Sequence, residues 1–278
     1  MPELPEVEII KNSLAEKTKG KRILYVEIYN EKMVQHPNKN TLENEVLGRK
    51  IESVDRRGKY IIINLSGERY LVLHLRMTGQ IVVKDKKEND KYLRARFKLS
   101  GENYMDFCDK RKFATIAFLD KKELNSWKSI SELGPEPLSK EFTFNYLKKS
   151  LLKSKRPIKT LILNQKVIAG LGNIYADEAL FKAKLNPCKT SRELTIHEMS
   201  ALFFAIKMVL NEGIKFNGTS FSDYIDANGQ SGRYQEKLNV YQQNGKECVD
   251  CGTEIKKIKL SGRGTFFCPR CQSEEEGG

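Results

Sequence analysis

The first six residues, Met-Pro-Glu-Leu-Pro-Glu, contain the groups in this chain best suited to covalent chemistry. Removal of the initiator methionine would turn the nitrogen of Pro2 into a free secondary amine. An α-amino group has a reference pKa of about 8, so a useful fraction is unprotonated at neutral pH. Such an amine can attack a carbonyl-like carbon and form an imine. Glu3 and Glu6 are close enough in sequence to act as an acid or base in that step.

A purely structural interpretation of the same residues is also open. Pro2 and Pro5 are favourable at the start of a helix, and we expect a helix over residues 3–15. Glu3 and Glu6 would then interact favourably with the positive end of the helix dipole. Taken alone, the segment favours this structural role. Features elsewhere in the sequence distinguish between the two interpretations.

Four cysteines near the C-terminus form two Cys-x2-Cys pairs, Cys248 with Cys251 and Cys268 with Cys271. This spacing is typical of a structural zinc site with four thiolate ligands, and it predicts one bound Zn²⁺. The residues between the pairs have room for a β-hairpin with Arg263 at its exposed tip. Four thiolates leave no open coordination position, so this zinc would hold the fold and take no part in chemistry.

The charge balance favours a polyanionic partner. The chain carries 49 Lys and Arg against 36 Asp and Glu, a net charge of +13. Nucleic acid is the first expectation, with an acidic membrane surface as the alternative. Residues 145–166 hold basic side chains and no acidic one: Lys148, Lys149, Lys153, Lys155, Arg156, Lys159 and Lys166. A charged run of this kind is often only a solvated helix face.

A glycine turn follows the basic run and strengthens the interpretation as a nucleic-acid site. Gly170 and Gly172 stand just before an expected helix, where a tight turn can aim free backbone N–H groups at a phosphate. Asn173 can cap that helix and also reach a phosphate oxygen. With the arginine-tipped zinc hairpin added, nucleic-acid binding becomes the better interpretation.

The composition suits a folded protein of two domains, with 39% hydrophobic and 31% charged residues in 278. No apolar run approaches the roughly 18 residues that a membrane span needs. The N-terminus lacks a secretion signal pattern, so we expect the protein to stay in the cytoplasm. Cysteines in such a protein are metal ligands or free thiols, and Cys108 and Cys188 are expected to be ordinary thiols.

The pattern of apolar residues changes along the chain. Segments rich in Ile, Val, Tyr and Phe predict strands at 22–29, 50–55, 60–65, 70–75, 80–83, 95–99, 104–107 and 114–119. This many short strands predict a β-sandwich closed over the opening helix. Beyond residue 124 the spacing becomes helical, and we expect helices at 142–152, 158–163, 173–181 and 195–210.

Two segments mark the boundaries between domains. The Leu-Gly-Pro-Glu-Pro stretch at 133–137 is the expected linker, and the polar stretch 217–235 has the composition of a functional loop. We therefore expect an N-terminal catalytic domain over 1–132, a helical DNA-binding domain over 133–235 and a zinc finger over 236–278.

Taken together, the chain resembles the bacterial formamidopyrimidine-DNA glycosylases (the Fpg/MutM family). The resemblance rests on stretches that occur in order along the chain: MPELPEVE at 1–8, RRGKY at 56–60, HLRMTG at 74–79, GLGNIYADE at 170–178 and GRGTFFCPRC at 262–271. It implies an α+β protein with an N-terminal β-sandwich and flanking helix, a helix–two-turn–helix domain and a C-terminal zinc finger, with DNA lying in the cleft between the domains. It also implies a bifunctional enzyme of base-excision repair that removes 8-oxoguanine and formamidopyrimidines and then cuts the abasic strand.

The resemblance further implies roles for particular residues. Pro2 would be the Schiff-base nucleophile, Glu3 the acid that assists opening of the deoxyribose, and Lys59 and Arg263 would serve the two eliminations. Contacts with the phosphate backbone of DNA would come from His74, Lys155, Lys159 and Asn173. Glu178, like Glu6, would help to position the terminal amine. The expected partner is damaged double-stranded DNA, bound by a monomer.

A glycosylase cannot reach the sugar of a stacked nucleotide, so it has to flip that nucleotide and fill the gap. The resemblance gives this task to Met77, Arg111 and Phe113. Apolar wedges can occupy the vacancy, and an arginine can hydrogen-bond the orphaned base. Without the resemblance, Met77 and Phe113 would pass for core residues and Arg111 for a surface cation.

Two other functions compete with this one. Endonuclease VIII shares the terminal proline, the helix–two-turn–helix and the zinc finger, but prefers oxidised pyrimidines. Leu4 together with Met77, Arg111 and Phe113 favours the purine enzyme. A DNA-binding protein without catalysis could use the same zinc finger and basic helices. It would need neither the terminal amine nor Glu3, so blocking the N-terminus distinguishes it from an enzyme.

Overall fold

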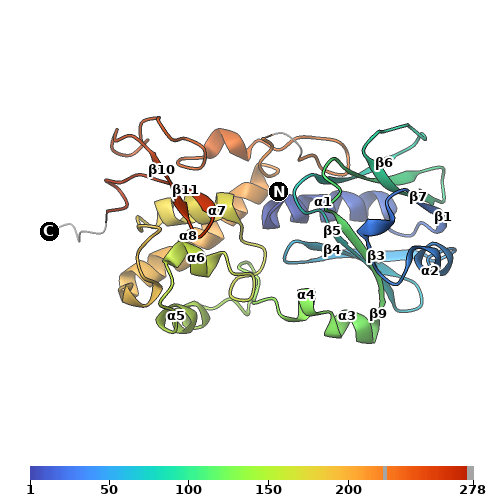
Figure 1. Cartoon of the computed structure of the whole chain (residues 1–278), viewed down its shortest axis with the longest axis horizontal. Helices are drawn as coiled ribbons and strands as arrows, with labels where there is room; N and C mark the ends of the chain where they lie inside the picture. Colours follow the sequence, from blue (N-terminus) through green and yellow to red (C-terminus); the bar gives the residue numbers. More distant parts are fainter. Residues whose placement is uncertain (222–223, 274–278) are drawn as a thin grey trace. The chain divides into compact units, whose positions relative to one another are not determined.

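The computed structural model describes residues 1–221 and 224–273, and the chain divides into two compact units (Figure 1). The first comprises Met1–Glu132 together with Phe216–Gln235, and the second comprises Leu133–Lys215 together with the chain from Glu236 onward. The first boundary falls at the expected linker. The loop that follows Lys215 groups with the N-terminal unit, and the three-domain division with boundaries at 132 and 235 stays a prediction.

Two β-sheets form the frame of the first unit. One has the order β1 (Ile23–Ile28), β7 (Leu93–Leu99), β8 (Tyr104–Asp109) and β6 (Gly79–Lys84). The other has the order β2 (Val34–His36), β9 (Thr115–Asp120), β5 (Arg69–His74), β4 (Tyr60–Leu65) and β3 (Ile51–Arg57). Side chains of both sheets share one apolar core, among them Ile61, Leu73, Phe97 and Phe107. The expected N-terminal β-sandwich is therefore confirmed.

Helix α1 (Leu4–Thr18) opens the chain and packs into the same core. It begins at a capping box, in which the Glu3 side chain accepts from the N3 backbone and the Glu6 side chain accepts from the Glu3 backbone. Val7, Ile10 and Leu14 recur at helical spacing and are fully buried. The predicted opening helix is present, and its first turn is held by the two residues proposed for chemistry.

Several short elements of the first unit were not predicted: η1 (Glu31–Met33), α2 (Lys39–Glu45), α3 (Lys121–Ser126) and α4 (Lys128–Ser131), along with strand β2. Trp127 and Ile130 pack with Leu124 against Val72 and Leu119 of the five-stranded sheet. Each of these helices has seven residues or fewer, too short to show a helical period.

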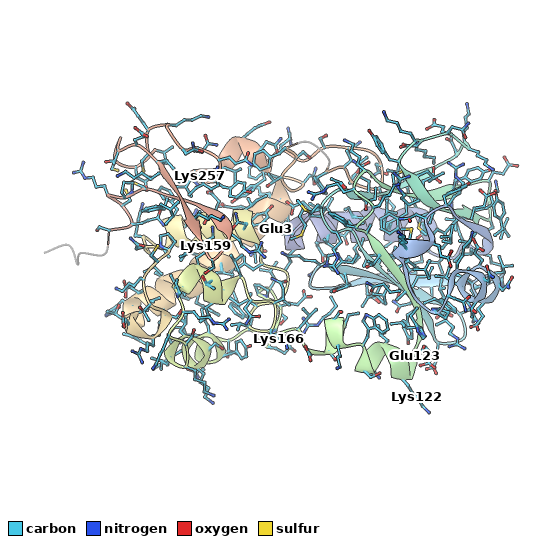
Figure 2. The ribbon with its side chains drawn as sticks, viewed as in Figure 1. Glu3, Lys122, Glu123, Lys159, Lys166 and Lys257 are labelled. Atoms are coloured by element: carbon cyan, nitrogen blue, oxygen red, sulfur yellow. The ribbon has the colours of Figure 1, made fainter. Side chains whose placement is uncertain are left out.

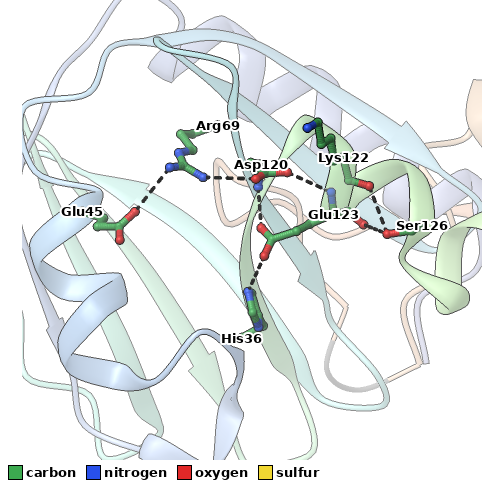
Figure 3. A network of polar contacts seen from close by, with 7 residues as sticks. All are labelled: His36, Glu45, Arg69, Asp120, Lys122, Glu123 and Ser126. Atoms are coloured by element: carbon green, nitrogen blue, oxygen red, sulfur yellow. Dashed lines mark hydrogen bonds and ion pairs between the residues drawn. The ribbon is translucent and has the colours of Figure 1, made fainter.

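A polar network fixes α3 beside the sheet (Figure 3). Asp120 caps the helix through the backbone N–H of Glu123, at 2.8 Å. Glu123 in turn lies 2.9 Å from Nε2 of His36. The guanidinium of Arg69 lies 3.8 Å from both Asp120 and Glu45. Because these side chains are partly exposed, their pairing supports the local geometry more than the overall stability.

The described parts of the 216–235 segment are fastened to the N-terminal unit by backbone groups. The N–H of Thr219 donates to Glu6 at 2.8 Å, and the N–H of Ala227 donates to the hydroxyl of Ser13 at 3.1 Å. Val83 of β6 donates to the carbonyl of Ala227 at 3.1 Å. The loop predicted from its polar composition is therefore attached to helix α1 at two places.

The second unit is helical with a small hairpin. Its elements are α5 (Phe144–Leu152), α6 (Ile158–Ile162), α7 (Asn173–Lys182), η2 (Ser191–Glu193), α8 (Ile196–Lys215), η3 (Tyr234–Lys237, which spans the boundary after residue 235), β10 (Lys256–Leu260) and β11 (Arg263–Phe267). Helices α7 and α8 pack closely at Gly213, where a Cβ would lie 2.5 Å from the Tyr175 ring. The predicted helices and zinc hairpin are present.

Within the described ranges 1–221 and 224–273, no helix combines the length and the apolar character that a bilayer crossing requires.

Candidate functional site

The N-terminus is held by a buried carboxylate. Glu6 is 1% exposed, and its Oε2 accepts from the N–H of Glu3 at 2.8 Å while its Oε1 accepts from the N–H of Thr219 at 2.8 Å. Gly218, with φ of +77°, lies so close that a Cβ there would be 2.9 Å from Cγ of Glu6. Glu6 therefore joins the first turn of α1 to the 216–235 segment, which suits its expected positioning role.

Pro2 and Glu3 are both buried at the start of α1, where Figure 2 labels Glu3. Met1 precedes them and is 48% exposed. Loss of Met1 would therefore remove little from the core and would turn the Pro2 nitrogen into an amine that directly precedes Glu3 in the chain. The arrangement fits a nucleophile with an acid next to it.

Lys59 is held in place through the same helix. It is 8% exposed and lies in the two-residue turn between β3 and β4. Arg56 fixes that turn, since its Nε donates to Glu8 of α1 at 2.7 Å and its Nη1 donates to the carbonyl of Gly58 at 2.9 Å. Neither Glu8 nor Arg56 was a candidate from sequence alone, although they lie in the stretches MPELPEVE and RRGKY.

His74 is a buried, neutral imidazole. Burial, together with the charges of Arg76 and Lys59, lowers the pKa of His74 to about 3. Its Nδ1 accepts from the N–H of Arg76 at 3.0 Å, so the ring proton is assigned to Nε2. Any contact with a phosphate would therefore use the neutral Nε2–H and not a charged imidazolium.

This neutral state predicts a pH dependence of stability. The ordinary pKa of His74 is 6.5 and the folded value is about 3, so the unfolded chain binds more protons between these values. The contribution of His74 to the free energy of unfolding should be complete above pH 6.5 and fall as the pH drops, by up to about 1.4 kcal/mol per pH unit. Urea unfolding between pH 5 and 6.5 should show a flatter dependence in His74→Gln than in the parent. Equal slopes in both proteins would contradict the buried neutral state.

Met77, Arg111 and Phe113 meet on the surface of the first unit. Met77 is 44% and Phe113 53% exposed, so neither is a core residue. Nη1 of Arg111 lies 3.0 Å from Sδ of Met77, and its Cζ lies 4.9 Å from the centre of the Phe113 ring. Residues far apart in sequence thus form one exposed cluster, which we call the wedge. An apolar wedge with an adjoining guanidinium suits insertion beside an unpaired base.

In the second unit, Lys155 and Arg263 are exposed, Lys155 after α5 and Arg263 at the start of β11. Asn173 begins α7, and its Nδ2 donates to the carbonyl of Gly264 at 2.9 Å. Among the described residues its Oδ1 has no hydrogen-bond partner. These positions leave Lys155 and Arg263 able to meet a phosphate, with Asn173 bonded directly to the hairpin.

Lys159, labelled in Figure 2, is a buried residue of the second unit. It is 1% exposed, and its Nζ donates to the carbonyl of Gly264 and to Oγ1 of Thr265, both at 2.9 Å. Its charge is paired with Asp177 at 2.7 Å. A buried ammonium needs such partners, because burying an unpaired charge is costly. Lys159 therefore joins α6 to the zinc hairpin, and its expected contact with the DNA backbone stays a prediction.

Glu178 is as deeply buried as Lys159, and its carboxylate accepts hydrogen bonds from other residues of the second unit. Its Oε1 accepts from the N–H groups of Val240 and Tyr241, and its Oε2 accepts from Asn239, each at 2.9 Å. The carboxylate therefore fixes the segment that leads into the zinc finger. Its expected part in positioning the terminal amine stays a prediction.

The four cysteines converge. The sulfur atoms of Cys248, Cys251, Cys268 and Cys271 all lie within 4.8 Å of one another, with Cys248 to Cys271 at 3.9 Å and Cys251 to Cys268 at 3.5 Å. Ligand sulfurs about 2.3 Å from a tetrahedral zinc lie about 3.8 Å apart. The cluster therefore fits the four-thiolate zinc predicted from the spacing.

Comparison with known proteins agrees with this arrangement. Three family models match: the formamidopyrimidine-DNA glycosylase N-terminal domain over residues 1–116, the H2TH domain of the same enzymes over 133–224, and the zinc finger found in FPG and IleRS over 245–273. Formamidopyrimidine-DNA glycosylase of Pelotomaculum thermopropionicum is 44% identical over 98% of this chain and 99% of its own length. The enzyme of Carboxydothermus hydrogenoformans is 43% identical over 98% of this chain and 100% of its own length.

Solved structures give the same result. A mutant of the Lactococcus lactis FPG, in complex with DNA containing Fapy-dG, matches with a TM-score of 0.93 and 34% identity over 98% of this chain and 100% of that one. MutM bound to DNA containing carbocyclic 8-oxo-G matches with a TM-score of 0.92 and 35% identity over the same shares. Fold, cysteine site and relatives define a zinc-containing DNA glycosylase of base-excision repair. The chain belongs to the formamidopyrimidine-DNA glycosylase family, whose members combine glycosylase and abasic-site lyase activities.

Proposed function

We propose that this protein excises oxidised purines, 8-oxoguanine and formamidopyrimidines, from duplex DNA and then cleaves the abasic strand on both sides. The observation that carries the proposal is the buried N-terminal turn directly after Pro2, in which the Glu6 carboxylate accepts hydrogen bonds from the backbone N–H groups of Glu3 and Thr219. Related proteins of the same fold have been captured on DNA containing Fapy-dG and carbocyclic 8-oxo-G, which supports this choice of substrate.

In the proposed reaction, the Pro2 amine attacks C1′ of the flipped nucleotide and the bond to the damaged base breaks. Glu3 assists opening of the deoxyribose, which leaves an imine between Pro2 and the sugar. The imine acidifies the neighbouring carbon, so successive eliminations can release the strand on the 3′ and the 5′ side. We assign the first elimination to Lys59 and assistance of the second to Arg263.

The remaining residues of the site would bind DNA. We propose that Lys155, Asn173 and the Nε2–H of His74 contact the phosphate backbone, and that the wedge fills the gap left by the flipped nucleotide. Arg111 would hydrogen-bond the base opposite the lesion. We also propose that the protein acts as a monomer on nucleoid DNA in the bacterial cytoplasm.

Strand cleavage on two matched duplexes tests the substrate. One duplex carries 8-oxoguanine opposite cytosine, and the other carries thymine glycol in the same sequence. We expect cleavage of the first to be faster by at least about tenfold, a difference of about 1.4 kcal/mol in transition-state binding. Preference for thymine glycol would replace this proposal by an endonuclease VIII-like function. DNA binding without cleavage of either duplex would support the noncatalytic alternative.

A further inference from the structure

Asp109 ends strand β8 directly before the loop that carries Arg111 and Phe113. It is 1% exposed, and both carboxylate oxygens accept hydrogen bonds. Its Oδ2 accepts from the backbone N–H groups of Phe113 at 2.7 Å and Ala114 at 2.8 Å. Its Oδ1 accepts from the N–H of Arg111 at 3.1 Å and from the hydroxyl of Thr78 at 2.5 Å. An ionised carboxylate offers about four acceptor sites, so these four donors use its full capacity.

Thr78 connects this loop to the turn that carries Met77. Its hydroxyl donates to Asp109 and also accepts from the N–H of Arg111 at 3.1 Å. The turn itself is tight, because a Cβ at Gly79 would lie 2.4 Å from the carbonyl oxygen of Leu75. Neither turn can shift relative to the other without breaking bonds to a buried carboxylate. Asp109 and Thr78 therefore hold the backbone of Arg111 and Phe113 directly, and Thr78 ties the turn that carries Met77 to the same carboxylate.

We propose that Asp109, acting through Thr78, is the positioning residue for recognition of the base opposite the lesion. The two residues hold the turns that carry Met77, Arg111 and Phe113 in the same arrangement in the absence of DNA. This inference rests on the proposed function of the wedge. An exposed arginine and methionine have many rotamers, and ordering them only on binding would cost conformational entropy. Fixing the backbone beneath them lowers that cost and aims the guanidinium in one direction.

Two substitutions at Thr78 isolate the effect. Thr78→Val keeps the shape of the side chain but removes the hydroxyl, so Asp109 loses one donor and the Arg111 N–H loses one acceptor. Thr78→Ser keeps the hydroxyl and serves as the matched control. Asp109→Asn is the stronger change, because the amide group places a donor against two backbone N–H groups or against the Thr78 hydroxyl. If Asp109→Asn fails to fold, the pair at Thr78 still decides the question.

The measurement is the single-turnover rate of excision of 8-oxoguanine opposite cytosine and opposite adenine. Thr78→Val should lower the ratio of the two rates by about tenfold, the effect expected when one hydrogen bond to a charged group is lost. Thr78→Ser should keep the ratio of the parent within about twofold, close to the scatter expected for a neutral substitution. Borohydride trapping on a single strand with an abasic site, which has no opposite base, should be equal in all three proteins.

Each outcome decides the inference. A lowered ratio with unchanged trapping supports positioning by Asp109 and Thr78. An unchanged ratio in Thr78→Val overturns it, as does an equal loss of excision and trapping, which would indicate only a damaged fold. If the parent protein itself fails to excise 8-oxoguanine, the proposed function fails, and this result is distinct from an active parent whose variants keep its selectivity.

Discussion

A chain that retains Met1 should form no covalent adduct with damaged DNA when borohydride is present during the reaction. In that chain the nitrogen of Pro2 is part of a peptide bond, and an amide nitrogen does not attack C1′ to give an imine. The processed chain should be trapped as a reduced adduct joined through Pro2. Denaturing electrophoresis of labelled abasic DNA measures the adduct, and mass spectrometry of the trapped peptide identifies the attachment point.

The control for this experiment is the same preparation before and after treatment with a methionine aminopeptidase. Trapping should return when Met1 is removed, since Met1 is about half exposed and lies outside the buried first turn. Glu3→Gln in the processed chain should slow base excision by at least about a hundredfold, the lower range for loss of a general acid, while DNA affinity changes little. Attachment through Lys59 or another lysine in the unmodified chain would contradict the N-terminal mechanism.

Loss of the zinc site should abolish DNA binding by the second unit. Cys268 is fully buried and directly follows β11, the strand that begins with Arg263. Structural zinc sites contribute roughly 10–16 kcal/mol of apparent binding energy, so the small hairpin should not persist without the metal. The parent protein should contain about one zinc per chain. Cys268→Ala should lose both the metal and tight binding to abasic-site DNA.

Cys188→Ala is the matched control, because it removes a thiol of the same unit that lies outside the four-cysteine cluster. It should keep the zinc and the DNA affinity of the parent. Metal analysis and fluorescence anisotropy at one fixed salt concentration measure the two quantities. Full DNA affinity in a metal-free Cys268→Ala protein would contradict a structural role of the zinc in DNA binding.

Some of this protein could be predicted from local sequence. The zinc site follows from cysteine spacing alone, because each Cys-x2-Cys pair can supply two neighbouring ligands wherever the chain brings the pairs together. The strands of the sandwich follow from short runs of apolar residues broken by turns. The helix at the N-terminus follows from Pro2 and Pro5 at its start and from Glu3 and Glu6 near the positive end of its dipole, and the same residues also indicated chemistry. These features depend on neighbours within a few positions.

The burial of individual side chains, and their hydrogen-bond partners from distant segments, could not be predicted from local sequence. The sequence placed Lys159 among surface cations, but the tertiary structure pairs it with Asp177 and bonds it to Thr265, more than a hundred positions away. Nothing local distinguishes this lysine from Lys155, which is exposed four positions earlier. The wedge could not be predicted from local sequence either. Met77 and Phe113 are apolar residues of a kind usually found in the core, and only the tertiary structure shows that they are exposed.

The sequence by itself thus determined the zinc ligands and the class of partner, because these depend on residue type and short spacing. It also indicated the candidate nucleophile and acid, through the ordered stretches that resemble the glycosylase family. The tertiary structure alone decided that Glu6 binds the 216–235 segment, that Asp109 holds the wedge, and that Lys159 belongs to the interior. The physical reason is that a buried polar group is fixed by whichever partners satisfy its hydrogen bonds, and those partners come from segments that only folding brings together.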